Sequence, residues 1–126
     1  MASKFITLHN KLDNSLIGIN VDDIVCVSYS PNKQVTLVYM DWHVSEKDAF
    51  LVNEKLQVIV KKIDDDSNYI IIHSKTSNNE VLIAKDGIQT IIDNPRGGCV
   101  IKLTFDTFAE ITVNESTTSV VDMINR

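Results

Sequence analysis

The sequence lacks the features that most directly identify a catalytic, metal-binding or membrane protein. Its two cysteines, Cys26 and Cys99, lie in separate apolar runs without Cys-x-x-Cys or Cys/His ligand spacing, so we expect two buried free thiols. No apolar run approaches the length of a membrane span, and the segment after Met1 has no signal-peptide core. These absences predict a protein with no metal, cofactor or membrane partner, located or assembled in the cytoplasm.

Basic residues are also scarce. Twelve lysines and arginines stand against 17 acidic residues, which gives a formal net charge of −5 and a pI of about 5.0. Affinity for a phosphate backbone depends on basic side chains that displace condensed counterions. The adjacent pair Lys61-Lys62 is followed directly by Asp64-Asp65-Asp66. Composition therefore predicts that nucleic acid is an unlikely partner, and no small-molecule ligand is evident.

What the sequence does contain is a repeat. Ile19–Val27, which reads Ile-Asn-Val-Asp-Asp-Ile-Val-Cys-Val, returns 64 positions later as Ile83-Ala-Lys-Asp-Gly-Ile-Gln-Thr-Ile. An ungapped alignment of residues 5–32 with 69–96 gives eight identities in 28 positions, where composition alone would give about one or two. The identical pairs are Ile6/Ile70, His9/His73, Lys11/Lys75, Asn14/Asn78, Ile19/Ile83, Asp22/Asp86, Ile24/Ile88 and Pro31/Pro95. The chain is therefore interpreted as a tandem duplication.

Each copy is rich in β-branched residues between polar turns, which is typical of short antiparallel strands. The fold class predicted is α+β, mainly antiparallel β, with two pseudo-equivalent small β-barrel or β-meander modules, each followed by a short helix. The predicted modules are residues 1–63, with a helix at about 46–62, and residues 64–126, with a helix at about 115–125. The apolar stripe in Leu56–Ile63 favours a helix, and a strand is the alternative.

The repeat also predicts how the copies differ. The register that pairs Ile6 with Ile70 extends to Val35/Cys99, Leu37/Ile101 and Tyr39/Leu103. Beyond these strands, the second copy is expected to carry about five extra residues near 105–110. Where the first copy has Asp23, the second has Gly87, a substitution that indicates a turn whose geometry matters more than its charge.

Two short patterns carry a resemblance to a known family. Ile19-Asn-Val-Asp-Asp-Ile24 in the first copy and Val113-Asn-Glu-Ser116 in the second resemble the small flagellar-operon FlbD-like family, which implies a non-enzymatic module. The chain is more loosely similar to LytTR-type DNA-binding domains, which also place short strands before a helix. Its compact, acidic and duplicated character resembles the auxiliary or decoration proteins of tailed-phage capsids.

The polar candidates for chemistry do not form a catalytic set. His9 and His73 stand at equivalent strand ends, but a metal site needs three or four converging ligands, so we expect structural imidazoles. His43 is expected on a strand surface. Asp64–Asp66 lacks the spacing that wraps a calcium ion, and Arg96-Gly97-Gly98 is too short to cradle a phosphate. Both segments are expected to be turns.

Three aromatic residues are the candidate site residues. Trp42, Phe105 and Phe108 fall in the connection before the last strand of each copy, where the copies differ most. Aromatic side chains dominate interface energetics, so these residues are candidates for a protein-protein interface. The alternative is that they close the core of their own module. Unpaired edge strands offer a further route to assembly.

The function predicted on this basis is a non-catalytic structural or assembly protein. The specific expectation is a virion component, such as an auxiliary (decoration) capsid protein, with other protein subunits and possibly a capsid lattice as partners. The alternative is a small intracellular regulatory or adaptor module, FlbD-like or LytTR-like, that binds protein or, less readily, DNA. The predicted location is the virion, with the cytoplasm as the alternative.

Overall fold

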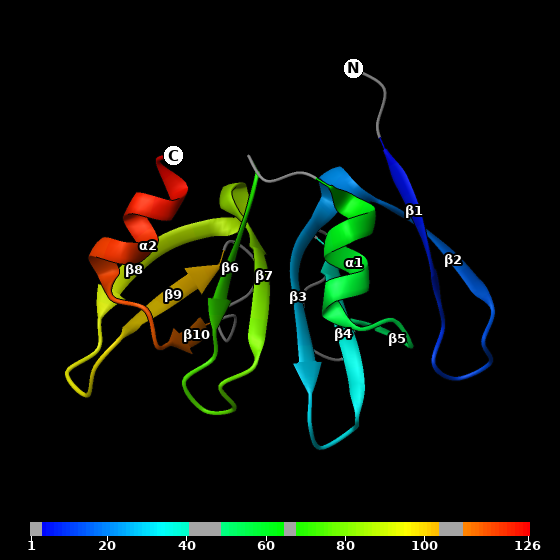
Figure 1. Ribbon diagram of the computed structural model, residues 1–126, viewed down its shortest axis with the longest axis horizontal. Helices are drawn as coiled ribbons and strands as arrows, with labels where there is room; N and C mark the ends of the chain where they lie inside the picture. Colours follow the sequence, from blue (N-terminus) through cyan, green and yellow to red (C-terminus); the bar gives the residue numbers. More distant parts are fainter. Residues whose placement is uncertain (1–3, 41–48, 65–67, 104–109) are drawn as a thin grey trace.

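The computed structural model describes residues 4–40, 49–64, 68–103 and 110–126, and within them it is an α+β fold of antiparallel strands with short helices (Figure 1). Both copies have the same order of elements. The first copy contains β1 (Phe5–His9), β2 (Leu16–Asn20), the 3₁₀ turn η1 (Val21–Asp23), β3 (Ile24–Ser30), β4 (Val35–Met40), β5 (Phe50–Val52) and α1 (Leu56–Ile63). The second contains β6 (Tyr69–His73), β7 (Glu80–Ala84), the 3₁₀ turn η3 (Lys85–Gly87), β8 (Ile88–Asp93), β9 (Cys99–Leu103), β10 (Glu110–Val113) and α2 (Thr117–Ile124).

The strands form three sheets, and the central one combines the two copies. Its order is β5-β4-β3-β7-β6, so β3 of the first copy pairs with β7 of the second. The hairpin β1-β2 forms a two-stranded sheet, and β10-β9-β8 form a three-stranded sheet. In Figure 1 the β1-β2 hairpin and the β8-β9-β10 sheet lie at opposite ends of the molecule. The predicted fold class, α+β with mainly antiparallel strands and two short helices, is confirmed.

The hydrogen bonds repeat as well as the strands. His9 N donates to Glu54 Oε1 over 2.9 Å in the first copy, and His73 N donates to Glu115 Oε1 over 3.0 Å in the second. The histidines are 64 positions apart, as predicted, but the glutamates are only 61 apart. The second copy is thus shorter after its first strands, and the prediction of about five extra residues is wrong.

The shift in spacing starts in the β8-β9 turn. Val27 pairs with Val38 in the first copy, and its equivalent Ile91 pairs with Ile101 in the second. Val38 and Ile101 are 63 positions apart, so the predicted pairs from Val35/Cys99 to Tyr39/Leu103 were out of register by one residue. A one-residue slip in a strand moves each side chain to the opposite face of the sheet. The strand pairing therefore shows which residues of β4 and β9 are equivalent.

The helices are shorter than predicted. α1 covers Leu56–Ile63, so the helix favoured for this segment is confirmed. The predicted start near residue 46 is wrong, because Phe50–Val52 pairs with β4 as a strand. α2 covers Thr117–Ile124 within the predicted range, and Ser116 Oγ caps it by accepting the amide of Ser119. The division of the chain into modules at residue 63 stays a prediction.

Each copy has its own apolar core, and the two cores exchange residues. The first core contains strands β1 to β5 and α1, but it also takes Tyr69 and Leu82 from the second copy. The second core takes Val25 and Cys26 from β3. Tyr69 further donates its hydroxyl hydrogen to the carbonyl of Val21. The pairing of β3 with β7 therefore joins two interdependent cores.

The glycine of η3 has a packing reason. A Cβ built on Gly87 would lie 2.7 Å from Val25 Cγ1, because η3 packs directly against β3. A side chain at this position would clash with the Val25 side chain, so one of the two would have to move. The sequence difference between Asp23 and Gly87 thus marks the place where one copy contacts the other.

Candidate functional site

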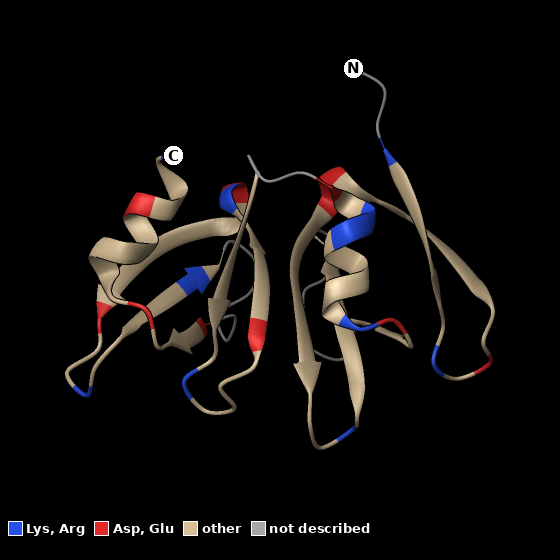
Figure 2. Cartoon of the chain, viewed as in Figure 1, with Lys and Arg blue, Asp and Glu red and all other residues tan. Residues whose placement is uncertain are grey.

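Four hairpin turns lie along one edge of the molecule, and each carries one exposed basic side chain. They are the turns β1-β2, β3-β4, β6-β7 and β8-β9, which lie along the lower edge in Figure 2. Their cations are Lys11, Lys33, Lys75 and Arg96, all exposed. We call this the hairpin edge. It presents a row of positive charge on a chain whose net charge is −5.

Local hydrogen bonds fix the shape of these turns. Asn10 Oδ1 accepts the amide of Leu12 over 2.9 Å, and Asn94 Oδ1 accepts the amide of Arg96 over 3.4 Å. Such side-chain caps are the usual reason for asparagine in turns. Asn14 and Asn78 occupy equivalent left-handed positions with φ of 60° and 59°, a conformation that asparagine tolerates better than most residues. The tips are thus held in defined conformations.

Two of the tips lie against one another. Lys75 Nζ donates to the carbonyl oxygen of Arg96 over 3.3 Å. This contact brings the ammonium group of the β6-β7 turn to the backbone of the β8-β9 turn. By contrast, the β1-β2 turn also contains Asp13, whose pKa is lowered by hydrogen bonds from Ser15. The positive charge is therefore concentrated on Lys33, Lys75 and Arg96.

A groove of about 410 Å³ opens between the second and third hairpins. Its walls come from the end of β3, from the β6-β7 turn, from β4 and from β10. The lining is rich in hydroxyl groups, which can both donate and accept hydrogen bonds. Those groups belong to Ser28, Tyr29, Ser30, Tyr39, Ser74, Thr76, Ser77 and Thr112. The groove can therefore hold a polar ligand beside the cations of the hairpin edge.

The two equivalent histidines are held by glutamates. His9 Nδ1 lies 2.7 Å from Glu54 Oε2, and His73 Nδ1 lies 2.8 Å from Glu115 Oε2. Each glutamate also accepts the backbone amide of its histidine. These His–Glu clasps tie the first strand of each copy to the segment before its helix. They are structural pairs, and the described residues contain no group of three or more possible metal ligands.

The charges of the second clasp shift each other's ionisation. The hydrogen bond that His73 donates to the Glu115 carboxylate raises the pKa of His73. Burial acts to raise the pKa of Glu115, but the hydrogen bonds from His73 outweigh it and the pKa is lowered. The stabilisation from Glu115 is present above its reference pKa of 4.5 and is lost as the pH falls. The stabilisation from His73 is fully present below pH 6.5, its reference pKa. It is lost as the pH rises through the raised pKa of His73 in the folded protein.

The clasp therefore predicts a pH-dependent stability that one substitution removes. We expect the contribution of this pair to be greatest between about pH 4.5 and 6.5 and to decline toward pH 8. Glu115→Gln keeps an oxygen to accept the His73 amide but removes the charge. In this variant the decline should disappear and the pKa of His73 should fall toward its reference value. Urea unfolding at several pH values and NMR titration of the imidazole measure both effects, and an unchanged His73 pKa would contradict them.

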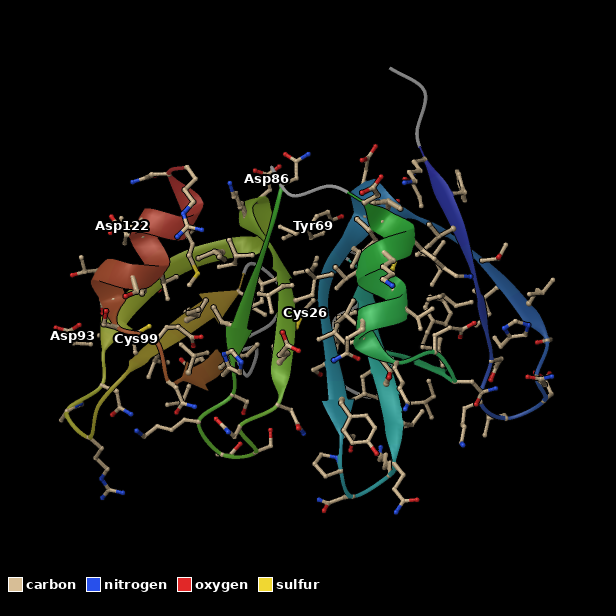
Figure 3. The ribbon with its side chains drawn as sticks, in the orientation of Figure 1. Cys26, Tyr69, Asp86, Asp93, Cys99 and Asp122 are labelled. Atoms are coloured by element: carbon tan, nitrogen blue, oxygen red, sulfur yellow. The ribbon has the colours of Figure 1, made fainter. Side chains whose placement is uncertain are left out.

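The thiols are buried, as predicted. Desolvation raises the pKa of Cys26 to about 12, and burial is also the main cause that raises the pKa of Cys99. Both are free cysteines, and Figure 3 shows them in different parts of the molecule. A thiol with a raised pKa is a poor nucleophile at neutral pH. Neither cysteine contributes to a reactive site.

The predicted site residues are not tested by the structure. Trp42, Phe105 and Phe108 lie outside the described residues, as do His43, Asp65 and Asp66. Asp64 ends α1 in a left-handed conformation with φ of 49°. Arg96-Gly97-Gly98 forms the expected hairpin turn, but its arginine belongs to the row of basic tips. The sequence reasoning missed this row because it considered net charge and adjacent basic pairs, not single cations on successive turns.

Comparison with known proteins identifies the fold. The LytTr DNA-binding domain of a response regulator from Bacillus cereus is similar to this chain with a TM-score of 0.65 at 11% sequence identity, and the match covers all of both chains. No protein-family model matches the chain, and no curated protein does. The chain therefore has the fold of that domain. Its assignment to the FlbD-like family stays a prediction.

The comparison corrects two predictions. The expectation of a phage-capsid component is contradicted, since a solved structure that shares the fold is a DNA-binding domain. The expectation that nucleic acid is an unlikely partner is contradicted by the same likeness. The physical reason is that net charge averages over the surface, whereas a partner contacts one edge. In the described part of the chain, no helix is long and apolar enough to cross a membrane.

Proposed function

We propose that this chain is a non-catalytic DNA-binding module of an intracellular regulator and that it contacts DNA with the hairpin edge. The observation that carries the proposal is the row of exposed cations, with Lys33, Lys75 and Arg96 as its main charges. The likeness to a LytTr DNA-binding domain supports it independently. A cytoplasmic location follows from this function.

The arrangement of the edge suits a duplex better than it suits a small ligand. Phosphate contacts position a protein on DNA, and they come from lysine, arginine and hydroxyl side chains. The hairpin edge offers such cations at several separate tips, with the hydroxyl-lined groove between the second and third hairpins. Lys33 stands at the tip of one flanking turn and Lys75 at the tip of the other. The groove residues are the candidates for contacts to sugar or base edges.

The acidic net charge is compatible with this function because several acidic residues lie far from the four tips, although Asp13, Glu80 and Asp93 stand beside the tips and Glu110 lines the groove. In Figure 2 the acidic residues of η1, η3 and α2 lie toward the edge opposite the hairpin tips. Glu54 and Glu115 are each hydrogen-bonded to a histidine in the His–Glu clasps. Screening reduces the effect of charges that lie more than about 8–10 Å away at physiological ionic strength. The field at the hairpin edge is therefore set mainly by its four cations and by the acidic residues beside them.

The test is the salt dependence of binding to a duplex. Three or four phosphate contacts give a slope of log affinity against log salt of about −2.7 to −3.6. Affinity for a fluorescein-labelled 30-base-pair duplex of random sequence should then fall about 40- to 150-fold between 50 and 200 mM NaCl. Fluorescence anisotropy measures this directly. No binding at low salt, or a slope near zero, would contradict the proposal.

A further inference from the structure

Two strands at the ends of the molecule each have one free edge. Within the described residues, β2 pairs only with β1, and β8 pairs only with β9. β2 has no charged residue, and β8 has Asp93 at its end. Proteins usually protect edge strands with lysine, proline or inward-pointing charges, and neither strand contains lysine, arginine or proline. Figure 1 places these two edges at opposite ends of the molecule.

The internal duplication shows what these edges fit. Inside the chain the two copies are joined by antiparallel pairing of β3 with β7, in the register Cys26↔Ile83, Val27↔Leu82 and Ser28↔Val81. β8 is the equivalent of β3, and β2 is the equivalent of β7, at a spacing of 64 residues. The strands with free edges, β8 and β2, are thus equivalent to the two strands that pair inside the chain, β3 and β7. Each lacks the partner that its equivalent has.

We propose that β8 of one molecule pairs with β2 of a second molecule and so repeats the β3-β7 junction between chains. The equivalent register is Thr90 opposite Ile19, Ile91 opposite Gly18 and Ile92 opposite Ile17 of the second molecule. One position further on, Asp93 stands opposite Leu16. The partner is another copy of this chain, joined by main-chain hydrogen bonds and side-chain contacts across the new pair.

Each of the two strands in the proposed junction carries an exposed apolar side chain. Ile92 is 61% exposed on β8, and Leu16 is 66% exposed on β2. The equivalent of Ile92 is Ser28, which pairs with the buried Val81 in the internal junction. In the proposed junction Ile92 meets Ile17 instead. The apolar side chain of Ile92 is then removed from water, whereas Leu16 faces Asp93 in the same junction.

The two junctions differ at the positions of Val25 and Gly87. At the internal junction Val25 packs against Gly87, and no room remains for a Cβ. The equivalent residues are Gln89 on β8 and Asp23 after β2. An amide side chain thus faces a carboxylate where a valine faces a glycine. Since Gln89 and Thr90 are exposed in the single molecule, we expect the new junction to be weaker than the internal one and reversible.

The bulge in β8 does not prevent pairing. The β8-β9 ladder shifts register between Ile88 and Thr90. The β3-β4 ladder shifts at the equivalent place, between Ile24 and Cys26, and β3 still pairs with β7. The two edges differ from one another and lie at opposite ends, so the contact is heterologous. Such a contact adds molecules head to tail and does not close into a symmetric dimer.

Two blocking variants test the direction of growth. Ile92→Lys puts a charge opposite Ile17, and Leu16→Glu puts a carboxylate opposite Asp93; both sites are exposed, so the fold should tolerate them. In sedimentation velocity the unchanged protein should grow in mass with concentration, and each variant alone should stay monomeric. An equimolar mixture should form a dimer and nothing larger, because each variant retains one open edge. Val58→Lys, on the exposed face of α1, is the matched control and should associate normally.

A third variant should strengthen the junction. Gly18 is the equivalent of Leu82, which is 3% exposed in the internal junction, and a Cβ on Gly18 meets no atom within 4 Å. Gly18→Leu supplies the missing side chain and should tighten association about tenfold, whereas Ile92→Lys should weaken it at least about tenfold. The proposal is overturned if the unchanged protein stays monomeric up to about 1 mM, which corresponds to a binding free energy weaker than about −4 kcal/mol. A mixture of the two blocked variants that stays monomeric would overturn it too.

Discussion

Lys33→Gln, Lys75→Gln and Arg96→Gln together are expected to weaken DNA binding about 500-fold at 0.1 M salt. Each lost phosphate contact removes the release of about 0.9 counterion, which at this salt concentration is about an eightfold change in affinity. Three contacts multiply to about 500-fold, and the slope of log affinity against log salt should become shallower by about 2.7. All three side chains are exposed, so the free energy of unfolding should change little. Anisotropy titrations across salt concentration measure both quantities.

The control removes the same charge from the opposite edge. Lys61, Lys62 and Lys85 lie on α1 and η3, away from the hairpin tips (Figure 2). Their replacement by glutamine gives the same change in net charge. If binding depended only on net charge, both triple variants would lose affinity equally, and that outcome would reject the hairpin edge as the interface. A selective loss in the first variant would support it.

Gly98→Ala is expected to destabilise the protein by about 3 kcal/mol or more. The alanine Cβ would lie 1.9 Å from the carbonyl oxygen of Val113, and the residue has φ of +73°. The clashing atom is backbone at the end of β10, where Val113 pairs with Cys99 and is fully buried. Overpacking of this kind costs typically 1–3 kcal/mol, and a left-handed non-glycine residue adds roughly 1 kcal/mol. A fall in Tm of about 10 °C or more follows for a domain of this size.

Two other glycines, Gly97 and Gly18, separate the effect of the clash from that of the backbone strain. Gly97 also has a positive φ, of +102°, but its added Cβ meets only Lys75 Nζ at 3.5 Å. Gly18 has neither a positive φ nor any atom within 4 Å of the added Cβ. We expect Gly97→Ala to cost much less than Gly98→Ala, and Gly18→Ala to be nearly neutral. Equal losses at Gly97 and Gly98 in thermal unfolding would show that φ, not the contact with β10, decides the effect.

The sequence predicted the repeated hairpins well because their signals are local. β-branched runs between Asn, Asp and Ser turns specify a strand and its bend without reference to distant residues. The helix predicted from the sequence begins too early, because Val52 fits the apolar spacing of the helix. In the structure Val52 pairs with Thr36 in the sheet. Tertiary pairing overrides a local pattern there. The β3-β7 junction could not be derived, since Cys26 and Ile83 carry no signal of their contact.

The candidate site was the harder part to predict. Trp42, Phe105 and Phe108 were chosen because the copies differ there, and they stay predictions. The basic tips were partly visible, because Lys11 and Lys75 are identical residues at equivalent turns. Whether these cations act together depends on which edge of the molecule each hairpin turn lies on. The pairing of the strands into sheets decides this. Four separate single cations become one row only when the turns lie along one edge.

The exchange of residues between the cores also sets the order in which a growing chain can fold. The first core needs Tyr69 and Leu82, so it cannot be completed on the ribosome until the β6-β7 hairpin has left the exit tunnel. Until then β3 has an unpaired edge on a nascent chain, where exposed strands are prone to wrong pairing. The junction closes contacts between residues more than 50 positions apart, such as Ser28 and Val81, and such contacts form slowly. Synthesis of the second copy is therefore the step that commits the first copy to its native structure.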